Sequence, residues 1–334
     1  MPRNKSRTVI IRTATASDLP AIVSLSSGMD HRTPAVIPNK HRQHGSELRE
    51  RLLDGCVLSA EREGEIIAAA GIDLENGVLS VLVFTNPATA NALFAKLVVQ
   101  AERLAACFGM RRLDVAVTPA VDKWFAWLGY TPGPGAMGQS PSARKRQRIH
   151  FSRSLLRRQT RFARQIRAIG EQLGIPDDYG RRHRLALQNE ASQLSSIGPD
   201  VFGREQFLAP NCAAAWFGMR AAAFEAGAEL QAVSAFRSVG YQRELLQKKL
   251  DKGLTMLEIL LVSAAPGYSE HHSGYALDIS TPGFAPLQEE FENSPAFTWL
   301  QKHAGTFGFR LSFPQGNRHK LAYEPWHWCY AGKS

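Results

Sequence analysis

The chain has 334 residues, of which 44% are hydrophobic and 21% charged, with a formal net charge of +10. These proportions are ordinary for a soluble globular protein, and no apolar run is long enough to cross a membrane, so no membrane partner is expected. The length exceeds that of one ordinary domain core and predicts two domains, or three.

The first half of the chain alternates short apolar strands with helices. Residues Thr15–Asp18 are typical of a helix cap and predict a helix over Leu19–Leu25. Further helices are expected over Asn91–Phe108 and around Trp124–Leu128. Strands are predicted over residues 9–12, 56–60, 65–71, 78–84, 113–117 and 149–153.

A loop rich in Pro, Gly and Ser at residues 131–142 interrupts this pattern, and we expect the first domain to span residues 1–155. Residues 156–204 are predicted to form an arginine-rich helical linker region, with an amphipathic helix over Leu155–Leu173. Residues 205–334 mix helices with short strands and are expected to form a second domain. The predicted fold class is α+β.

The positive charge is concentrated in the segment Arg144–Arg167, which contains ten Arg or Lys residues and no acidic one. Such a segment could bind nucleic acid by neutralising phosphates. It has few interleaved aromatic residues, however, and no recognised nucleic-acid-binding fold accompanies it. We therefore favour a solvated helix between the domains, and nucleic acid is an unlikely partner; attraction of an anionic substrate is a third alternative.

The cysteines and the N-terminus both favour a cytoplasmic location. The four cysteines lie far apart without a Cys-x-x-Cys pair, which is typical of reduced thiols. Residues Met1–Pro20 have a basic start but no apolar core of a signal peptide.

The first domain resembles the GNAT acetyltransferases. The resemblance rests on Ile11–Pro20, on the central strands and on Trp124–Tyr130. That family holds the pyrophosphate of acetyl-CoA on a glycine-containing turn at a helix N-terminus. Here the corresponding turn is Asn86–Ala92, and no glycine occurs from Val78 to Phe108. We expect a GNAT-like mixed sheet with helices that is not catalytic, and an active acetyltransferase is the alternative.

Two segments of the second half, Pro266–Ile279 and Tyr323–Trp328, concentrate side chains that bind metal ions. Together they supply two imidazoles and one carboxylate as ligands, with a further carboxylate beside them. Three protein ligands and an open position are typical of a catalytic zinc, whereas a structural zinc is usually closed by four. Alternation over Tyr275–Ile279 predicts a strand that turns Asp278 into a cleft. The metal chemistry therefore points to hydrolysis.

These segments resemble the VanY-type D-alanyl-D-alanine carboxypeptidases, zinc peptidases related to VanX. Ser269–Asp278 fits the family pattern Ser-x-His-x-x-Gly-x-Ala-x-Asp, and Glu324–Trp328 fits its Glu-Pro-Trp-His motif. The upstream Ser234–Ser238, with Gln242, resembles a third family element. The resemblance implies a zinc carboxypeptidase-like α+β domain.

The resemblance also implies a role for each motif residue. The zinc ligands would be His271, Asp278 and His327. Glu324 would act as general base, and Arg237 would stabilise the oxyanion. Substrate contacts would come from Ser269, Gln242 and Trp326. The adjacent His272 could be mistaken for the ligand, but the family spacing favours His271.

The predicted function is removal of the terminal D-Ala from peptidoglycan peptides by a zinc-dependent carboxypeptidase. With a cytoplasmic location, recycled muropeptides are the expected substrate pool, which ranks L,D-carboxypeptidase activity on tetrapeptides above D,D activity on pentapeptides or D-Ala-D-Ala. An acetyltransferase and a nucleic-acid-binding protein are the alternatives from other classes. The oligomeric state is left open.

Overall fold

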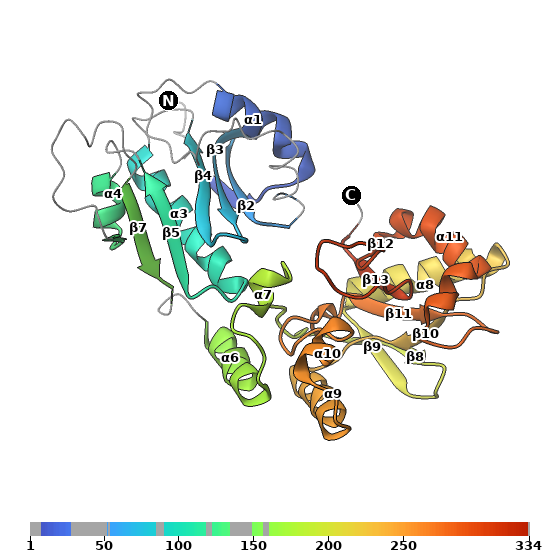
Figure 1. Cartoon of the computed structure of the whole chain (residues 1–334). Coiled ribbons are helices and arrows are strands. Elements are labelled where there is room, and N and C mark those ends of the chain that lie inside the picture. The colour runs from blue at the N-terminus through green and yellow to red at the C-terminus, as the bar shows by residue number, and fades with distance from the viewer. Residues whose placement is uncertain are drawn as a thin grey trace. The chain divides into compact units, whose positions relative to one another are not determined.

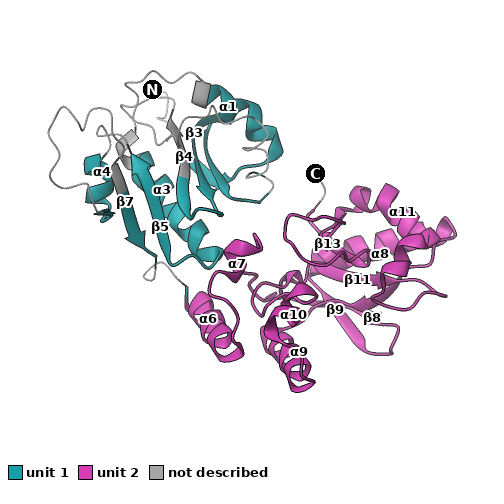
Figure 2. Ribbon diagram, in the orientation of Figure 1, with its two compact units in different colours: residues 1–160 teal, residues 161–334 magenta. Residues whose placement is uncertain are grey.

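The computed structural model describes residues 8–27, 52, 54–84, 90–117, 122–133, 149–155 and 160–332. Contacts between residues divide the chain into two compact units, Met1–Thr160 and Arg161–Ser334, which are teal and magenta in Figure 2. Each unit combines sheets with helices, which agrees with the predicted α+β class.

The N-terminal unit is built on one sheet with the strand order β1-β2-β3-β4-β5-β7-β6 (Figure 1). All neighbouring strands are antiparallel except β4 and β5, which run parallel. The strands are β1 (Ile10–Thr13), β2 (Val57–Arg62), β3 (Glu65–Asp73), β4 (Val78–Phe84), β5 (Arg112–Val117), β6 (Thr131–Pro132) and β7 (Ile149–Ser154). Its described helices are η1 (Ala16–Asp18), α1 (Leu19–Ser27), α3 (Ala90–Cys107) and α4 (Asp122–Trp127).

The predicted helix cap ties β1 to α1. The backbone N–H of Thr15 donates to Asp18 Oδ2 at 2.8 Å, which satisfies an amide at the start of the helical segment. Arg12 Nη1 lies 2.6 Å from the same oxygen, and Arg12 also pairs with Glu61 of β2. The hydrogen bond from Arg12 lowers the pKa of Asp18 to about 2. Beyond the cap, Ile22 of α1 packs in a hydrophobic cluster with Val57 and Ala69.

The C-terminal unit contains a four-stranded antiparallel sheet, ordered β10-β11-β13-β12, and a separate hairpin of β8 and β9. Its strands are β8 (Ser195–Pro199), β9 (Glu205–Leu208), β10 (Gln231–Ser234), β11 (Ala276–Ser280), β12 (Phe309–Leu311) and β13 (His327–Tyr330). The helices are α6 (Arg161–Leu173), α7 (Tyr179–Arg182), α8 (Pro210–Glu225), α9 (Val239–Asp251), α10 (Met256–Leu261), η4 (Glu270–Ser273), η5 (Glu289–Asn293), α11 (Pro295–His303) and η6 (Ala304–Phe307).

The described residues of the C-terminal unit form two hydrophobic cores, of which the first packs against this sheet. One gathers around Trp216 of α8, Phe297 of α11 and Trp328 of β13. The other joins α6, α9 and α10 through residues such as Ile166 and Ile259. Strand β11 is buried along its whole length, so the predicted alternation between a buried and a cleft-facing side does not appear in its burial.

The predicted arginine-rich helix differs from α6 in its start and its surroundings. Leu155 is not helical; it follows β7, and its backbone N–H donates to Arg111 O at 2.8 Å. Helix α6 begins at Arg161, within the region expected to be a linker, and its apolar side packs into the second core. Arg161 and Arg164 are exposed on its other side. Residues 134–148 and 156–159, with much of the basic segment, lie outside the described residues.

Candidate metal centre

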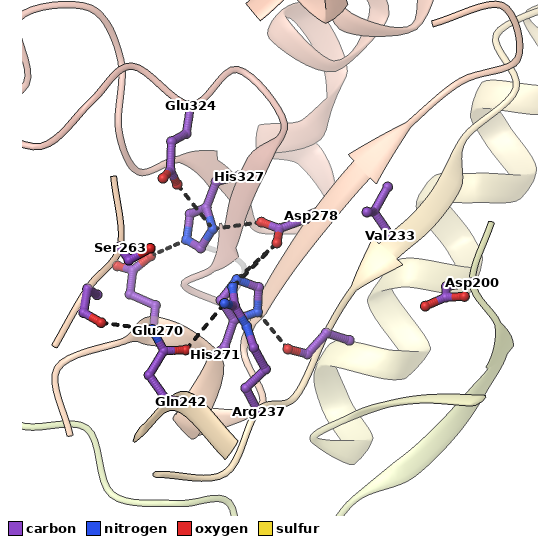
Figure 3. A network of polar contacts seen from close by, with 12 residues as sticks. Asp200, Val233, Arg237, Gln242, Ser263, Glu270, His271, Asp278, Glu324 and His327 are labelled. Atoms are coloured by element: carbon purple, nitrogen blue, oxygen red, sulfur yellow. Dashed lines mark hydrogen bonds and ion pairs between the residues drawn. The ribbon is translucent and has the colours of Figure 1, made fainter. Parts of the chain in front are cut away.

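Three of the predicted site residues meet at one point of the C-terminal unit. His271 in η4, Asp278 in β11 and His327 in β13 each offer a ligand atom, and these atoms all lie within 4.8 Å of one another. All three side chains are buried, with residue exposures of 1%, 3% and 3%. In Figure 3, dashed lines join both imidazoles to the Asp278 carboxylate.

Strand pairing and one glycine bring these residues together. Asp278 and His327 are direct partners in the antiparallel register of β11 and β13. Gly274 ends η4 with a φ of 72°, a conformation that favours glycine. A Cβ at Gly274 would lie 3.0 Å from the backbone nitrogen of Ala209, so the turn also lacks room for a side chain. The turn carrying His271 can therefore lie directly before the strand carrying Asp278.

His271 presents a free nitrogen to this centre. Its Nδ1 lies 2.6 Å from the Ala235 carbonyl oxygen, which can only accept, so Nδ1 carries the proton and donates it. Its Nε2 is buried without a hydrogen-bond partner and lies 3.3 Å from Asp278 Oδ2. Burial lowers the pKa of His271 to about 4, which keeps the ring neutral at pH 7. A buried lone pair beside a carboxylate is what a metal ligand requires.

His327 is oriented by two carboxylates. Its Nδ1 lies 3.0 Å from Asp278 Oδ1, and its Nε2 lies 3.0 Å from Glu270 Oε2. Burial disfavours the charged ring, but hydrogen bonds to Asp278 and Glu270 raise the pKa of His327 to about 10. A carboxylate on the far nitrogen of a histidine is a common outer partner of metal-ligating imidazoles. Once His327 Nδ1 gives up its proton, the set of two imidazoles and one carboxylate fits a zinc ion with an open position.

His272 is excluded as a ligand by its own hydrogen bonds. Its Nδ1 lies 2.6 Å from Arg237 O, and its Nε2 accepts from the backbone N–H of Gly267 at 3.0 Å. The side chain is completely buried. Both ring nitrogens are occupied by the backbone, so this histidine holds the loop around the centre.

Glu324 stands beside the three candidate ligands. Its Oε2 lies 3.9 Å from His327 Nδ1, and burial raises the pKa of its carboxyl to about 7. Residues 325 and 326 form a turn, and the His327 N–H donates to Glu324 O at 3.1 Å. The segment between Glu324 and His327 is therefore a tight turn.

Arg237 approaches the centre from the end of β10. Its Nη2 lies 3.4 Å from Asp278 Oδ2, and its Nη1 lies 3.3 Å from Gln242 Oε1. Gln242 in turn donates to Ala264 O at 2.8 Å, which fixes its side chain. The Arg237 Nε is buried without a hydrogen-bond partner. This guanidinium therefore keeps a donor that no described protein group uses.

The centre borders a cleft of about 580 Å³ and a smaller inner cavity of about 60 Å³. Glu324, Arg237 and Gln242 line both of them, while Ser269 lines the inner one and Trp326 the outer one. The structure thus places all of the sequence-predicted site residues at the centre or on these walls. Sequence reasoning missed two further polar residues, Glu270 behind His327 and Lys249 in the outer wall.

Comparisons with known proteins agree with this arrangement. Residues 205–333 match the VanY family model, which describes D-alanyl-D-alanine carboxypeptidases. The C-terminal unit carries a VanY-type domain. The family match begins inside this unit, at the start of β9, and includes no residue of the N-terminal unit. The resemblance of residues 1–155 to GNAT acetyltransferases therefore stays a prediction.

Individual relatives cover the chain in part. A Bacillus subtilis protein named as a carboxypeptidase, YodJ, is 35% identical over 170 residues, which are 49% of this chain and 59% of that protein. VanXYC of Enterococcus gallinarum, a bifunctional D-Ala-D-Ala dipeptidase and D-Ala-D-Ala carboxypeptidase, is 29% identical over 162 residues, 46% of this chain and 80% of that one. The chain also matches a solved structure of the LD-carboxypeptidase LdcB with 31% identity and a TM-score of 0.41. The match covers 46% of this chain and 79% of the LdcB chain.

The first curated relatives are longer than the region that they share with this chain. In the YodJ protein, the shared region is 59% of the length. The VanY family match covers residues 205–333, which are part of the C-terminal unit Arg161–Ser334. Within the part of the chain that the structure describes, no helix combines the length and apolar character needed to cross a membrane.

Proposed function

We propose that the C-terminal unit is a zinc-dependent carboxypeptidase that removes the terminal D-Ala from peptidoglycan peptides. The observation that carries the proposal is the buried, unpartnered Nε2 of His271 facing Asp278 and His327, with the Glu324 carboxylate at the same cleft. His271, Asp278 and His327 are the proposed zinc ligands.

Zinc, when bound, would polarise the scissile carbonyl and lower the pKa of a water to about 7. Glu324 is the proposed general base: it takes the proton of the attacking water and returns it to the nitrogen of the leaving amine. Arg237 donates hydrogen bonds to the carbonyl oxygen as negative charge develops on it. Water thus adds across one peptide bond, and the products are a shortened peptide and free D-alanine.

The remaining motif residues would hold the substrate. Ser269 and Gln242 would contact the departing residue, because both line the inner cavity together with Arg237. Trp326 lines the outer cleft and would contact the peptide ahead of the scissile bond.

Two forms of the activity differ in the residue before the scissile bond. We put L,D-carboxypeptidase activity on recycled tetrapeptides first, a ranking that rests on the cytoplasmic location expected from the sequence. D,D-carboxypeptidase activity on pentapeptides or D-Ala-D-Ala is the second form. It is favoured by the family description and by the relatives named as D-alanyl-D-alanine carboxypeptidases.

For the rest of the chain we propose a non-catalytic, GNAT-like N-terminal domain. Its mixed sheet with one parallel pair supports the fold in part. The turn expected to replace the acetyl-CoA site, Asn86–Ala92, lies mostly outside the described residues. Of the proposed linker, residues 156–204, the part from Arg161 onward belongs to the compact C-terminal unit.

One experiment tests the activity and its form. Zinc-loaded protein is incubated with tetrapeptide and pentapeptide muropeptides, with and without a chelator, and the products are weighed by mass spectrometry. Loss of one alanine from the tetrapeptide identifies the L,D form, and loss from the pentapeptide alone identifies the D,D form. The matched control is Glu324→Gln with equal zinc content. Absence of cleavage in both peptides by zinc-loaded protein would refute the proposed function.

A further inference from the structure

The wall of the outer cleft contains an ammonium group, that of Lys249, which forms no ion pair with any described residue. Lys249 lines the cleft from α9 and is half-buried. Its Nζ donates to Ser263 Oγ at 2.6 Å. Among the residues that the structure describes, no Asp or Glu forms an ion pair with it. Burial lowers the pKa of Lys249, because a charged amine is costly away from water.

The helix itself directs this side chain into the cleft. Ser238 caps α9 by accepting from the Tyr241 N–H at 3.0 Å, which fixes the start of the helix. Gln242, Leu245 and Lys249 follow at the three- and seven-residue spacing of one helical face, and all three line the cleft. Lys249 therefore shares a wall with Gln242, one of the proposed substrate contacts.

The other two cations of the cleft wall differ from Lys249 because each has an acidic partner. Arg204 pairs with the buried Asp200 at 2.7 Å, and Arg237 approaches Asp278 at 3.4 Å. Arg237 lowers the pKa of Lys249 and Glu324 raises it, so the three charges act on one another across the cleft. A half-buried cation that faces another cation gains from an anion supplied by a ligand.

We propose that Lys249 binds a carboxylate of the peptide substrate and makes the cleft selective for anionic peptides. The proposal rests on the proposed carboxypeptidase function and adds a specificity-determining residue to it. Two carboxylates of a peptidoglycan peptide have the required chemistry: the C-terminal carboxylate of the departing residue and a side-chain carboxylate on the third residue. Ser263 holds the ammonium in place for either one.

Binding is measured by calorimetry in the zinc-loaded Glu324→Gln protein, so that the peptide is not consumed. We expect Lys249→Met to raise the Kd of a tetrapeptide by about 10- to 100-fold, the range for a lost hydrogen bond to a charged group. Lys249→Arg, which keeps the charge, should retain most of the affinity. Lys248→Met is the matched control, because Lys248 is the preceding residue of the same helix and is exposed outside the cleft lining.

Two further peptides identify the carboxylate. If Lys249 binds the C-terminus, a tetrapeptide with a C-terminal carboxamide should bind the parent and Lys249→Met proteins equally. If it binds the third residue, a peptide with lysine at that position should remove the difference instead. An unchanged Kd in Lys249→Met, an equal change in all three peptides, or no binding by the parent protein overturns the proposal. Lys249-dependent binding without hydrolysis by the unsubstituted protein would refute the proposed function alone.

Discussion

Glu270 Oε2 and His327 Nε2 lie 3.0 Å apart, on the side of the imidazole that faces away from Asp278. Glu270 directly precedes His271 in the chain, yet its carboxylate reaches the other imidazole of the centre (Figure 3). Arg310 of β12 lies 3.6 Å from its second oxygen. One carboxylate thus links η4 to the side chains of β12 and β13 and fixes the ring that the proposed zinc would contact.

Replacing Glu270 should weaken zinc binding without removing a ligand. We expect Glu270→Ala to lower zinc affinity by about 10- to 100-fold, the usual effect of losing an outer hydrogen-bond partner. Competition with a chromophoric chelator measures the affinity. Glu225→Gln, at an exposed site on α8, is the control and should leave the affinity unchanged. An unaltered zinc affinity in Glu270→Ala would show that His327 does not need this carboxylate.

The two adjacent histidines should respond differently to the same substitution. His271→Gln removes the free Nε2 from the centre, so the purified protein should no longer hold zinc at a ratio near one. His272→Gln should keep the zinc but lower the unfolding midpoint, because two buried backbone hydrogen bonds are lost, each worth about 1 kcal/mol. Elemental analysis and thermal unfolding separate the two effects. Zinc loss in His272→Gln alone would reverse the assignment.

The sequence predicted those site residues that lie close together in the chain at a characteristic spacing. The Ser269–Asp278 pattern and the Glu324–His327 pair contain their chemistry within a few residues, so the side chains could be named before the fold was known. Glu270 could not, because its contact with His327 depends on how η4 and β13 pack. Lys249 did carry a signal: it follows Gln242 by seven residues, which would place both on one face if the segment were helical.

The fold shows the same division between local and distant information. The cap at Thr15–Asp18 and the helix after it were predicted from neighbouring residues and are confirmed. The amphipathic pattern of α6 was also present in the sequence, but such a pattern does not predict which residues its apolar face packs against. That partner, the core shared with α9 and α10, comes from residues far along the chain, and the helix consequently belongs to the C-terminal unit.

Glu324→Gln should separate chemistry from metal binding. Glu324 is not among the proposed ligands, so the variant should hold as much zinc as the unsubstituted protein. Removing the general base should lower kcat by about 10²–10⁴-fold, the usual contribution of proton transfer by a positioned side chain. Release of D-alanine from the preferred muropeptide measures the rate. Activity within a few-fold of the original would assign the base to another residue.

The Arg12–Asp18 pair should make the stability of the N-terminal unit depend on pH. Because Arg12 lowers the folded-state pKa of Asp18 to about 2, this carboxylate stabilises the fold above its unfolded pKa, about 4. That stabilisation is lost as the pH falls from about 4 to about 2. Urea unfolding of the protein and of Asp18→Asn should therefore differ at pH 7 and converge as the pH approaches 2. A difference that is independent of pH would exclude the ion pair as its source.

Ile166→Ala tests whether α6 stabilises the C-terminal unit. Ile166 is 4% exposed and packs in the core that contains Val239 and Ile259 of α9 and α10. Gly267, two residues before Ser269, has no room for a Cβ because that atom would lie 2.6 Å from the Ile166 side chain. Truncating this closely packed isoleucine should lower the free energy of unfolding by about 2–5 kcal/mol. Hydrogen exchange should then accelerate in α9 and α10, while Arg164→Ala, on the exposed side of α6, should leave it unchanged. Faster exchange confined to α6 would mean that the helix is a linker and adds nothing to the fold that holds the metal centre.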